Sequence, residues 1–226
     1  MKQNLTRRNF LASAGTATMA VAATTSLAAE STTGGNKLKI LGIACSPRKG
    51  MTTAKAVQAA LDAATSVDSR IEVELIDLGG LNIAGYSPKP PQDDFTGILP
   101  KLQDPAVGGL IIGSPSYFRG LSALCKAFVE RCAPLRDPKM LLAEKPIGVV
   151  AVGQFRNGGQ ELVIEQIQAA MLCFGMVPVG GHAPAFQGAT LLSADDSVAQ
   201  DELGLKTAAQ LGKHVAEAAI KLAKTA

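Results

Sequence analysis

Three short loops rich in Gly, Ser or Pro each follow an apolar run of this chain, and each is followed directly by an amphipathic segment. They span residues 45–53, 113–120 and 152–161. In an open α/β sheet, a ligand binds in the crevice beyond the carboxyl ends of the strands. Three loops in this order therefore predict one shared binding site at that edge of a sheet, which a single loop would not.

Apolar runs and segments of helical periodicity alternate along the chain. Residues 79–93 carry Gly, Pro and Asn without a sustained period, so we expect a loop there. This alternation predicts an α/β fold with a five-stranded parallel sheet of order 2-1-3-4-5, covered on both faces. The expected strands are 37–44, 71–77, 109–113, 146–152 and a short one at 176–179, and the expected helices are 52–66, 95–103, 122–133, 160–174 and 201–224.

The first 29 residues have the pattern of an export signal. Arg7-Arg8 precede Asn9-Phe10-Leu11, and a weakly apolar run follows that ends in small residues at Ala28-Ala29. The run is too polar for a spanning helix, and a paired arginine is typical of the twin-arginine export route. We expect cleavage near Ala28 or Ala29 and a periplasmic or otherwise exported protein. A disordered tail with a chance arginine pair is the alternative.

Removal of this signal changes the charge of the protein. The whole chain carries 22 basic and 19 acidic residues, and three of the basic ones lie in residues 1–29, where no acidic residue is found. A neutral mature protein lacks the electrostatic footprint for nucleic acid or for an anionic membrane surface. We therefore expect neither partner and no stable membrane anchor. Residues 30–37 are expected to be a flexible leader, and residues 38–226 a single domain.

The first loop has the features of a phosphate site. A turn that leads into a helix presents free N–H groups and the positive end of the helix dipole. Ser46, Thr52 and Thr53 add hydroxyl donors, Gly50 permits a tight turn, and Arg48 can supply charge or cover the ligand. The spacing is not that of a Walker-type loop. An ordinary strand–helix turn with Thr at the N-cap is the alternative.

The second loop places two adjacent aromatic residues at a strand end. The chain has only nine aromatic residues, two of them Tyr, so Tyr117-Phe118 is a notable pair. Pro115 stiffens the turn and Gly120 permits close approach, which suits the border of a flat ring. Alternatively, the two rings pack under the following helix.

The third loop offers hydrogen-bond donors beside a flexible backbone. Gly158-Gly159 permits main-chain approach, and Arg156, Asn157 and Gln160 offer donors for the electron-rich side of a flavin. Such donors favour an anionic reduced flavin. A turn that simply caps the following helix is the alternative, and it is compatible with ligand binding.

These loops resemble those of the NAD(P)H-dependent FMN reductase and flavodoxin-like oxidoreductase superfamily. Within it, they are most similar to the iron–sulfur flavoproteins and to the quinone reductases of the tryptophan-repressor-binding-protein type. The resemblance covers roughly residues 38–180, and Met51 and Thr52 stand where Gly and Asn are common. It rests on Ser46-Pro47-Arg48-Lys49-Gly50 with Thr52-Thr53, on Pro115-Ser116-Tyr117-Phe118-Arg119-Gly120, and on Asn157-Gly158-Gly159-Gln160-Glu161.

The resemblance implies a flavodoxin-like three-layer sandwich, bound FMN, a homo-oligomer and two-electron transfer from NAD(P)H to a quinone, a flavin or another small acceptor. Export conflicts with NAD(P)H as the donor. A flavodoxin-type electron carrier and a protein that has lost its flavin are the alternatives. Hydride transfer depends on alignment, so no catalytic residue and no metal ligand is assigned. The candidate FMN-binding residues are Ser46, Arg48, Met51, Thr52, Thr53, Pro115, Ser116, Tyr117, Phe118, Phe155, Arg156, Asn157, Gly158 and Gly159.

Cysteine placement argues against a metal cluster. Iron–sulfur members carry a compact cysteine cluster after the second strand, whereas residues 79–94 contain no cysteine. All four cysteines are expected to be buried structural thiols. Cys45 is the exception for which a lowered pKa is expected, because it borders the first loop and a helix N-terminus lowers a thiol pKa. Neither histidine has a recognisable partner in sequence. The residues concerned are Cys45, Cys125, Cys132, Cys173, His182 and His214.

Overall fold

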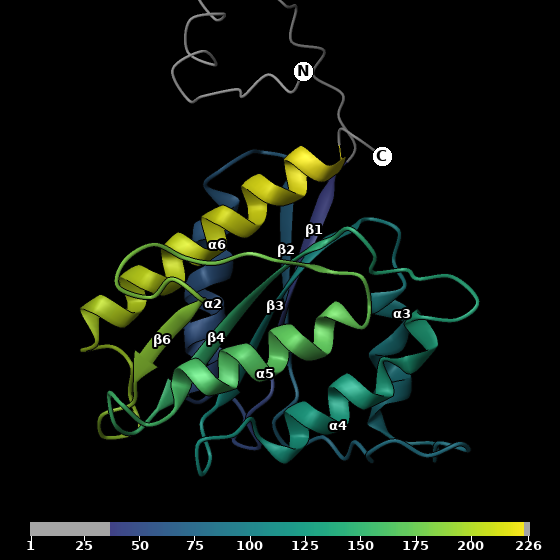
Figure 1. The fold of residues 1–226 in the computed structure, drawn as a ribbon, viewed down its shortest axis with the longest axis horizontal. Coiled ribbons are helices and arrows are strands. Elements are labelled where there is room, and N and C mark those ends of the chain that lie inside the picture. Colours follow the sequence, from purple (N-terminus) through teal and green to yellow (C-terminus); the bar gives the residue numbers. More distant parts are fainter. Residues whose placement is uncertain (1–36, 224–226) are drawn as a thin grey trace, which may run out of the picture. The chain divides into compact units, whose positions relative to one another are not determined.

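A single parallel sheet organises the part of the chain that the computed structural model describes, residues 37–223 (Figure 1). The predicted order is confirmed, since the strands follow one another as β2-β1-β3-β4-β5 and a further strand, β6, also pairs with β4. The predicted export signal lies outside the described residues. The strands are β1 (Leu38–Ala44), β2 (Ile71–Asp77), β3 (Val107–Pro115), β4 (Pro146–Gly153), β5 (Val177–Pro178) and β6 (Ala189–Leu192).

The edge beside β4 differs from the expectation. A single fifth strand was predicted at 176–179, but two short strands share this edge. β5 pairs with Pro146 and Ile147, and β6 pairs with the carboxyl half of β4, from Val150 to Gly153. The intervening segment 179–188 contains Gly180, Gly181 and Pro184, which interrupt a ladder because they lack a side chain or an N–H donor. A strand of four residues such as β6 gives too short a pattern to be recognised in sequence.

Five α-helices and two 3₁₀ turns complete the described part of the chain. Four of the predicted helices are confirmed to within two residues at each end. The fifth, predicted at 95–103, is instead a 3₁₀ turn followed by the single turn α3, because Pro100 in the first turn of α3 has no N–H to continue the preceding turn. The elements are α2 (Thr52–Thr65), η1 (Asp94–Gly97), α3 (Leu99–Leu102), α4 (Ala123–Arg131), η2 (Ala133–Leu135), α5 (Gln160–Leu172) and α6 (Glu202–Ala223).

Two apolar layers hold the sheet. Alternate residues of β1 enter opposite layers: Ile40 packs with α2 and α6, whereas Leu41 and Ile43 pack on the side of α4 and α5. Figure 1 shows α4 and α5 together on the near side of the sheet. This two-sided burial accounts for the continuous apolar runs of the strands. None of the helices within residues 37–223 has the length and apolar character needed to cross a membrane.

Candidate functional site

The first loop joins β1 to α2 at the carboxyl edge of the sheet. Ser46 is buried, whereas residues 47–50 are exposed. α2 begins at Thr52, and its N-cap residue Met51 makes no side-chain hydrogen bond to the helix. The alternative of a Thr N-cap is therefore wrong. The N–H groups of the first helical turn receive no cap from a side chain, and such groups bind anions well.

Thr53 marks the same helix end as a polar site. Its side chain is buried, and its Oγ1 atom has no hydrogen-bond partner among the described residues. A buried hydroxyl without a partner costs free energy, so such groups indicate a missing ligand or water. The exposed residues 47–50 are held by a hydrogen bond to a neighbouring strand. Asp77, at the end of β2, accepts hydrogen bonds from the N–H of Gly50 at 2.7 Å and of Gly79 at 2.9 Å.

The second loop follows β3 and forms a tight two-residue turn. Tyr117 and Gly120 exchange backbone hydrogen bonds of 2.9 and 3.0 Å. Phe118 and Arg119 between them have φ values of 51° and 64°, which side chains other than Gly rarely adopt. Phe118 is fully exposed and Tyr117 is 42% exposed. The alternative in which both rings pack under the next helix is therefore wrong.

The third loop leads from β4 into α5 and locks onto the second. Gly159 is the N-cap of α5 with φ 92°, and a Cβ atom built there would lie 2.8 Å from the Cα of Arg119. Ser116 donates from its N–H to the carbonyl of Val152 at 2.8 Å and from its hydroxyl to the carbonyl of Gly158 at 2.7 Å. Only a glycine at 159 permits this packing. The second and third loops are thus joined into one rigid surface, which we call the preassembled wall.

A pocket of about 430 Å³ opens between these loops. Five of the candidate residues line it, from the first and second loops, together with the end of β4. A fourth segment, between β6 and α6, also contributes, and it is not among the three loops predicted from the sequence. Its Ala-Asp-Asp-Ser sequence contains turn-forming residues that could have indicated it. The lining residues are Arg48, Thr52, Pro115, Ser116, Tyr117, Val152, Gly153, Gln154, Ser193, Asp195 and Asp196.

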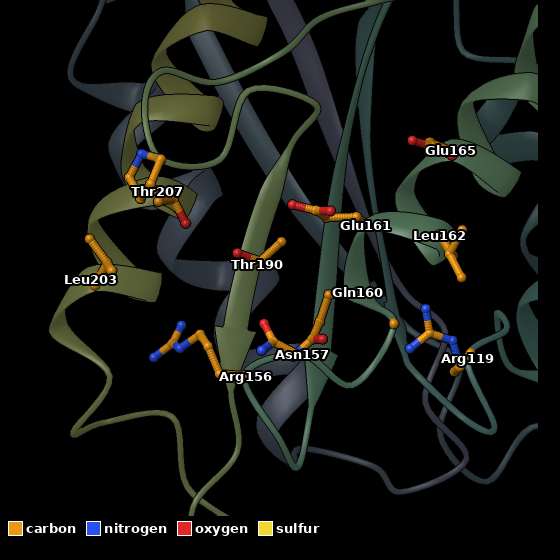
Figure 2. Close-up of a pocket in the computed structure, with 12 residues that line it drawn as sticks. Arg119, Arg156, Asn157, Gln160, Glu161, Leu162, Glu165, Thr190, Leu203 and Thr207 are labelled. Carbon is orange, nitrogen blue, oxygen red and sulfur yellow. The ribbon is translucent and has the colours of Figure 1, made fainter.

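A second pocket of about 440 Å³ lies on the other side of the third loop, between α5, β6 and α6. Figure 2 shows Arg156 and Arg119 on opposite sides of it, with Asn157 and Gln160 between them. Arg156 donates to the Asp201 carboxylate at 2.6 Å, which also accepts from the backbone of Leu192 at 2.6 Å. Three candidate residues, Arg156, Asn157 and Gly159, thus line this second pocket.

The remaining candidates line neither pocket. Ser46 and Thr53 are buried, and Met51 is the N-cap residue of α2 without a side-chain hydrogen bond to it. Phe118 and Phe155 have large exposed fractions. Gly158 contributes its carbonyl to the Ser116 hydroxyl. The first and second loops therefore meet around the first pocket. The third loop contributes some residues to the first pocket and others to the second pocket. Contact of these residues with FMN stays a prediction.

Two charged side chains of the first pocket interact across it. Arg48, on the first loop, donates from Nη1 to Asp196 Oδ1 at 2.5 Å. This hydrogen bond, with a smaller contribution from the Tyr117 hydroxyl, raises the pKa of Arg48. Asp196 lies in a two-residue turn closed by paired backbone hydrogen bonds between Ala194 and Ser197, of 2.9 and 2.8 Å.

The cysteines differ from two of the expectations. Burial of the Cys45 thiol, together with hydrogen bonding to Cys125, raises its pKa well above the ordinary value, so a lowered pKa is wrong. Desolvation by the protein outweighs the nearby helix N-terminus. Cys173 is exposed rather than buried, whereas Cys132 is fully buried as expected. Within residues 37–223, no group of three or more His, Cys, Asp or Glu side chains is arranged to hold a metal ion.

The histidines, which have no recognisable partner in sequence, meet each other in space. The rings of His182 and His214 lie edge to face with centroids 4.4 Å apart, and His214 Nδ1 lies 3.0 Å from the carbonyl oxygen of Gly180. Both are remote in sequence from the three loops, and neither lines the first pocket.

Known proteins share both the sequence pattern and the fold. The family model "NADPH-dependent FMN reductase" matches residues 38–190. The chain is 39% identical over 198 residues to an iron–sulfur flavoprotein of Methanocaldococcus jannaschii, and the match covers 83% of this chain and 100% of that protein.

Two solved structures show the same fold at lower identity. RosB with bound 8-demethyl-8-formylriboflavin-5′-phosphate has a TM-score of 0.64 at 16% identity, covering 83% of this chain and 81% of that one. The Trp repressor binding protein from Bacillus subtilis has a TM-score of 0.50 at 24% identity, covering 77% and 99%.

Proposed function

Because the chain belongs to the NADPH-dependent FMN reductase family, we propose that it transfers two electrons from a reduced donor to a quinone, a flavin or another small acceptor. Membership of this family makes the protein an FMN-binding oxidoreductase with a flavodoxin-like fold. NAD(P)H is the donor that the family suggests. FMN, when bound, supplies the electron chemistry, and the protein binds the cofactor, orients it and limits its contact with water.

The observation that carries the proposal is the fit between the first pocket and a phosphorylated ring. Beside the pocket, the uncapped N-terminus of α2 and the buried, unpartnered Thr53 hydroxyl suit a dianion. Thr52, in the same turn, lines the pocket itself. The lining also includes Tyr117, Gly153 and Gln154, which suit the face and edge of an isoalloxazine. This combination of anion-binding and aromatic groups in one region supports FMN as the ligand.

Alignment, rather than proton transfer by a side chain, is the protein's part in this reaction. The residues that line the first pocket include neither His nor Cys. Hydride transfer requires a donor stacked on the flavin in a near-attack geometry, and a preassembled wall provides this orientation. The hydrogen bonds from Ser116 to the carbonyls of Val152 and Gly158 hold that wall in place.

An electron carrier of the flavodoxin type is the second candidate. A carrier docks through a strongly acidic surface, which a mature protein with equal numbers of basic and acidic residues does not offer. Purified protein should be yellow and should oxidise NAD(P)H in the presence of a quinone. A yellow protein that turns over no donor would favour the carrier. A colourless protein that ignores added FMN would overturn the proposal.

We also propose that the protein contains no iron–sulfur cluster, although curated relatives are named iron–sulfur flavoproteins. The support is the lack of cysteine in residues 79–94 and the full burial of Cys45, Cys125 and Cys132. These three thiols lie near one another in the core, but among residues 37–223 no group of three or more His, Cys, Asp or Glu side chains is arranged to hold a metal ion. Iron and sulfide analysis of protein prepared without oxygen tests this. About four iron atoms per chain, with the visible absorption of a cluster, would contradict it.

Export by the twin-arginine route is a further proposal, and it rests on Arg7-Arg8 and the small residues at Ala28-Ala29. Replacement of both arginines with lysine should leave an uncleaved, flavin-loaded protein in the cytoplasm, as measured by fractionation and intact mass. Equal export of the lysine variant would indicate the general secretory route. Unmutated protein found only in the cytoplasm with residues 1–29 intact would contradict export and remove the objection to NAD(P)H.

Assembly into a homo-oligomer is supported by exposed aromatic rings around the site. Phe118 is fully exposed and Phe155 is 70% exposed, and aromatic residues are enriched in the cores of protein interfaces. Light scattering on the FMN-loaded protein tests this proposal, and a strictly monomeric mass at high concentration would contradict it.

A further inference from the structure

The first loop contains an arginine with two conceivable uses. Arg48 lies four residues before the first turn of α2, so its guanidinium could extend to a phosphate at that helix end. It could instead extend over the pocket toward the ring. The sequence allows both uses, because Arg is suited equally to pairing with phosphate and to stacking on a planar ring.

The structure pairs Arg48 with an acidic residue of another loop. Its Nη1 atom donates to Asp196, a residue 148 positions away on the turn between β6 and α6, at 2.5 Å. The Tyr117 hydroxyl, on the second loop, also interacts with the guanidinium. All three residues line the first pocket. The guanidinium is therefore engaged by the turn between β6 and α6 and by the second loop.

The backbone of the first loop strengthens this assignment. Gly50 donates its N–H to Asp77, and Arg48 donates its own N–H to Ser46 Oγ at 3.2 Å. The exposed part of the loop is thereby tied to the β1 and β2 side of the sheet. The donors available to a phosphate begin after it, at the first turn of α2 and at the Thr53 hydroxyl. A phosphate at this helix end would thus find donors other than Arg48.

The backbone conformation and the hydrogen bonds of the turn that carries Asp196 fix the place of this residue. Asp195 and Asp196 have φ values of 47° and 55°, a conformation that Asp tolerates better than most residues. Asp201 fastens the base of the turn by accepting hydrogen bonds from Leu192 at 2.6 Å and Gly204 at 3.1 Å. The ion pair itself is exposed to water, so it contributes little to folding and mainly fixes a direction.

We propose that the turn Ala194–Ser197 is a fourth flavin-facing loop, in which Asp196 is a positioning residue that holds Arg48 beside the isoalloxazine ring rather than at the phosphate. This inference rests on the proposed FMN site. A cation beside the ring favours the anionic reduced flavin over the neutral oxidised form. Arg48 would then influence the reduction potential, while Thr52, Thr53 and the helix end discriminate FMN from riboflavin.

Riboflavin lacks the phosphate, so a comparison of the two ligands separates the two uses of Arg48. Arg48→Gln should lower the midpoint potential of bound FMN, with about a tenfold loss of preference for reduced flavin, ~30 mV for a two-electron couple. The ratio of FMN to riboflavin affinity should stay within twofold of the wild type. Thr53→Val is the matched control, and it should lower that ratio at least tenfold with the potential unchanged.

Asp196 is tested by the same two measurements. Asp196→Asn releases Arg48 toward the phosphate, so the ratio of FMN to riboflavin affinity should rise severalfold, and Asp196→Glu should restore it. Circular dichroism confirms that each variant is folded. A role confined to folding would weaken both ligands equally and leave the ratio unchanged, which would overturn the assignment of Asp196.

Three other outcomes would overturn the inference. Arg48→Gln could weaken FMN tenfold without affecting riboflavin, which would make Arg48 a phosphate ligand. It could change neither the ratio nor the potential, which would place it outside the ring site. If the wild-type protein binds neither ligand, the proposed function fails as well, and this result is distinct from the first two because they require a flavin-loaded protein.

Discussion

Two turns border the first pocket with the same backbone geometry and different side chains. Each has two central residues with positive φ and is closed by paired backbone hydrogen bonds. One, after β3, places Phe118 and Arg119 in this conformation, and the other, after β6, places Asp195 and Asp196 there. Asp tolerates the left-handed region, whereas Phe and Arg do so at a cost of about 1 kcal/mol or more each. Strain is thus concentrated in the aromatic turn.

The two turns are also fastened differently. The acidic turn is fixed by the Asp201 carboxylate, which receives hydrogen bonds from Arg156 and from two backbone N–H groups. The aromatic turn is fixed by neutral contacts: the hydrogen bonds of Ser116 to the third loop, that from the N–H of Leu121 to Gln166 Oε1 at 3.1 Å, and packing on Gly159. Neutral hydrogen bonds and close packing therefore hold the aromatic turn, whereas hydrogen bonds to a carboxylate hold the acidic turn.

Replacing Asp201, which holds the acidic turn, and Gln166, which holds the aromatic turn, should give the largest difference in the free energy of unfolding. Asp201→Ala loses several charge-assisted hydrogen bonds and a cap of α6, so it should lower the free energy of unfolding by about 3 kcal/mol. Gln166→Ala loses one neutral hydrogen bond and should cost about 1 kcal/mol. Urea unfolding measures both. Equal costs would mean that charge does not distinguish the two turns.

The same anchor predicts a dependence on pH. Burial of Asp201 raises its pKa, but hydrogen bonds from Arg156, Leu192 and Gly204 outweigh this and lower the pKa overall. A carboxylate with a lowered folded pKa contributes its full stability above the unfolded value of about 3.9 and loses it as the pH falls through the folded value. The cost of Asp201→Asn should therefore be constant from about pH 5 to 7 and shrink below about pH 4. A cost that grew toward acid would contradict this.

The phosphate end, which neither turn forms, gives a baseline for ligand affinity. Thr53→Val removes a hydroxyl that has no partner in the protein, so FMN should bind about 10- to 100-fold more weakly, corresponding to ~1.5–3 kcal/mol for a hydrogen bond to a charged group. Without flavin the variant should be as stable as the wild type or slightly more stable. Calorimetric titration and urea unfolding measure the two effects.

Thr207→Val is a suitable comparison for the Thr53 variant. The Thr207 hydroxyl is buried but paired, since it donates to the carbonyl of Gly204 at 2.8 Å. This variant should lose stability without flavin and retain its FMN affinity. The reverse pattern in the two variants would place the phosphate elsewhere.

Replacing the two central residues of each turn tests the difference in backbone strain between the turns. Phe118→Asn with Arg119→Gly gives the residues that such a turn prefers, and it should stabilise the flavin-free protein by about 1 kcal/mol. Asp195→Asn with Asp196→Gly should gain no more than a few tenths of a kcal/mol. Thermal unfolding measures both gains, at roughly 2–4 °C per kcal/mol for a chain of this size. Equal gains would show that the aromatic turn is not strained.

The smallest expected effect concerns the ring at the base of the aromatic turn. An aromatic side chain stacked near a flavin quenches its fluorescence, so Tyr117→Ala should brighten bound FMN or weaken its binding severalfold. Tyr86→Ala is the control, because this exposed tyrosine belongs to the segment 79–93 and lies outside the first pocket. Unchanged fluorescence and affinity in the Tyr117 variant would place the ring elsewhere.

Local patterns were sufficient for most of the elements. β1 and α2 were predicted to within a residue, because a buried parallel strand and an amphipathic helix have distinct periods. The same approach failed at β6, where four residues give too little pattern, and at residues 95–103, where Pro100 divides the helix. Cys45 failed for another reason. Its proximity to a helix N-terminus is visible in sequence, but the burial that raises its pKa is not.

The sequence by itself determined the sheet order, the flavodoxin-like fold and the three loops at one edge, since strands that alternate with helices have few right-handed ways to assemble. It also identified the residues of the first and second loops that now line one pocket. Only the tertiary structure decided how Arg48 points, that Thr53 lacks a partner, and that Arg156 pairs with Asp201 beside a second pocket. The two ion pairs join residues 148 and 45 positions apart, and the packing of β6 and α6 brings those residues together without leaving a periodic signal in the chain.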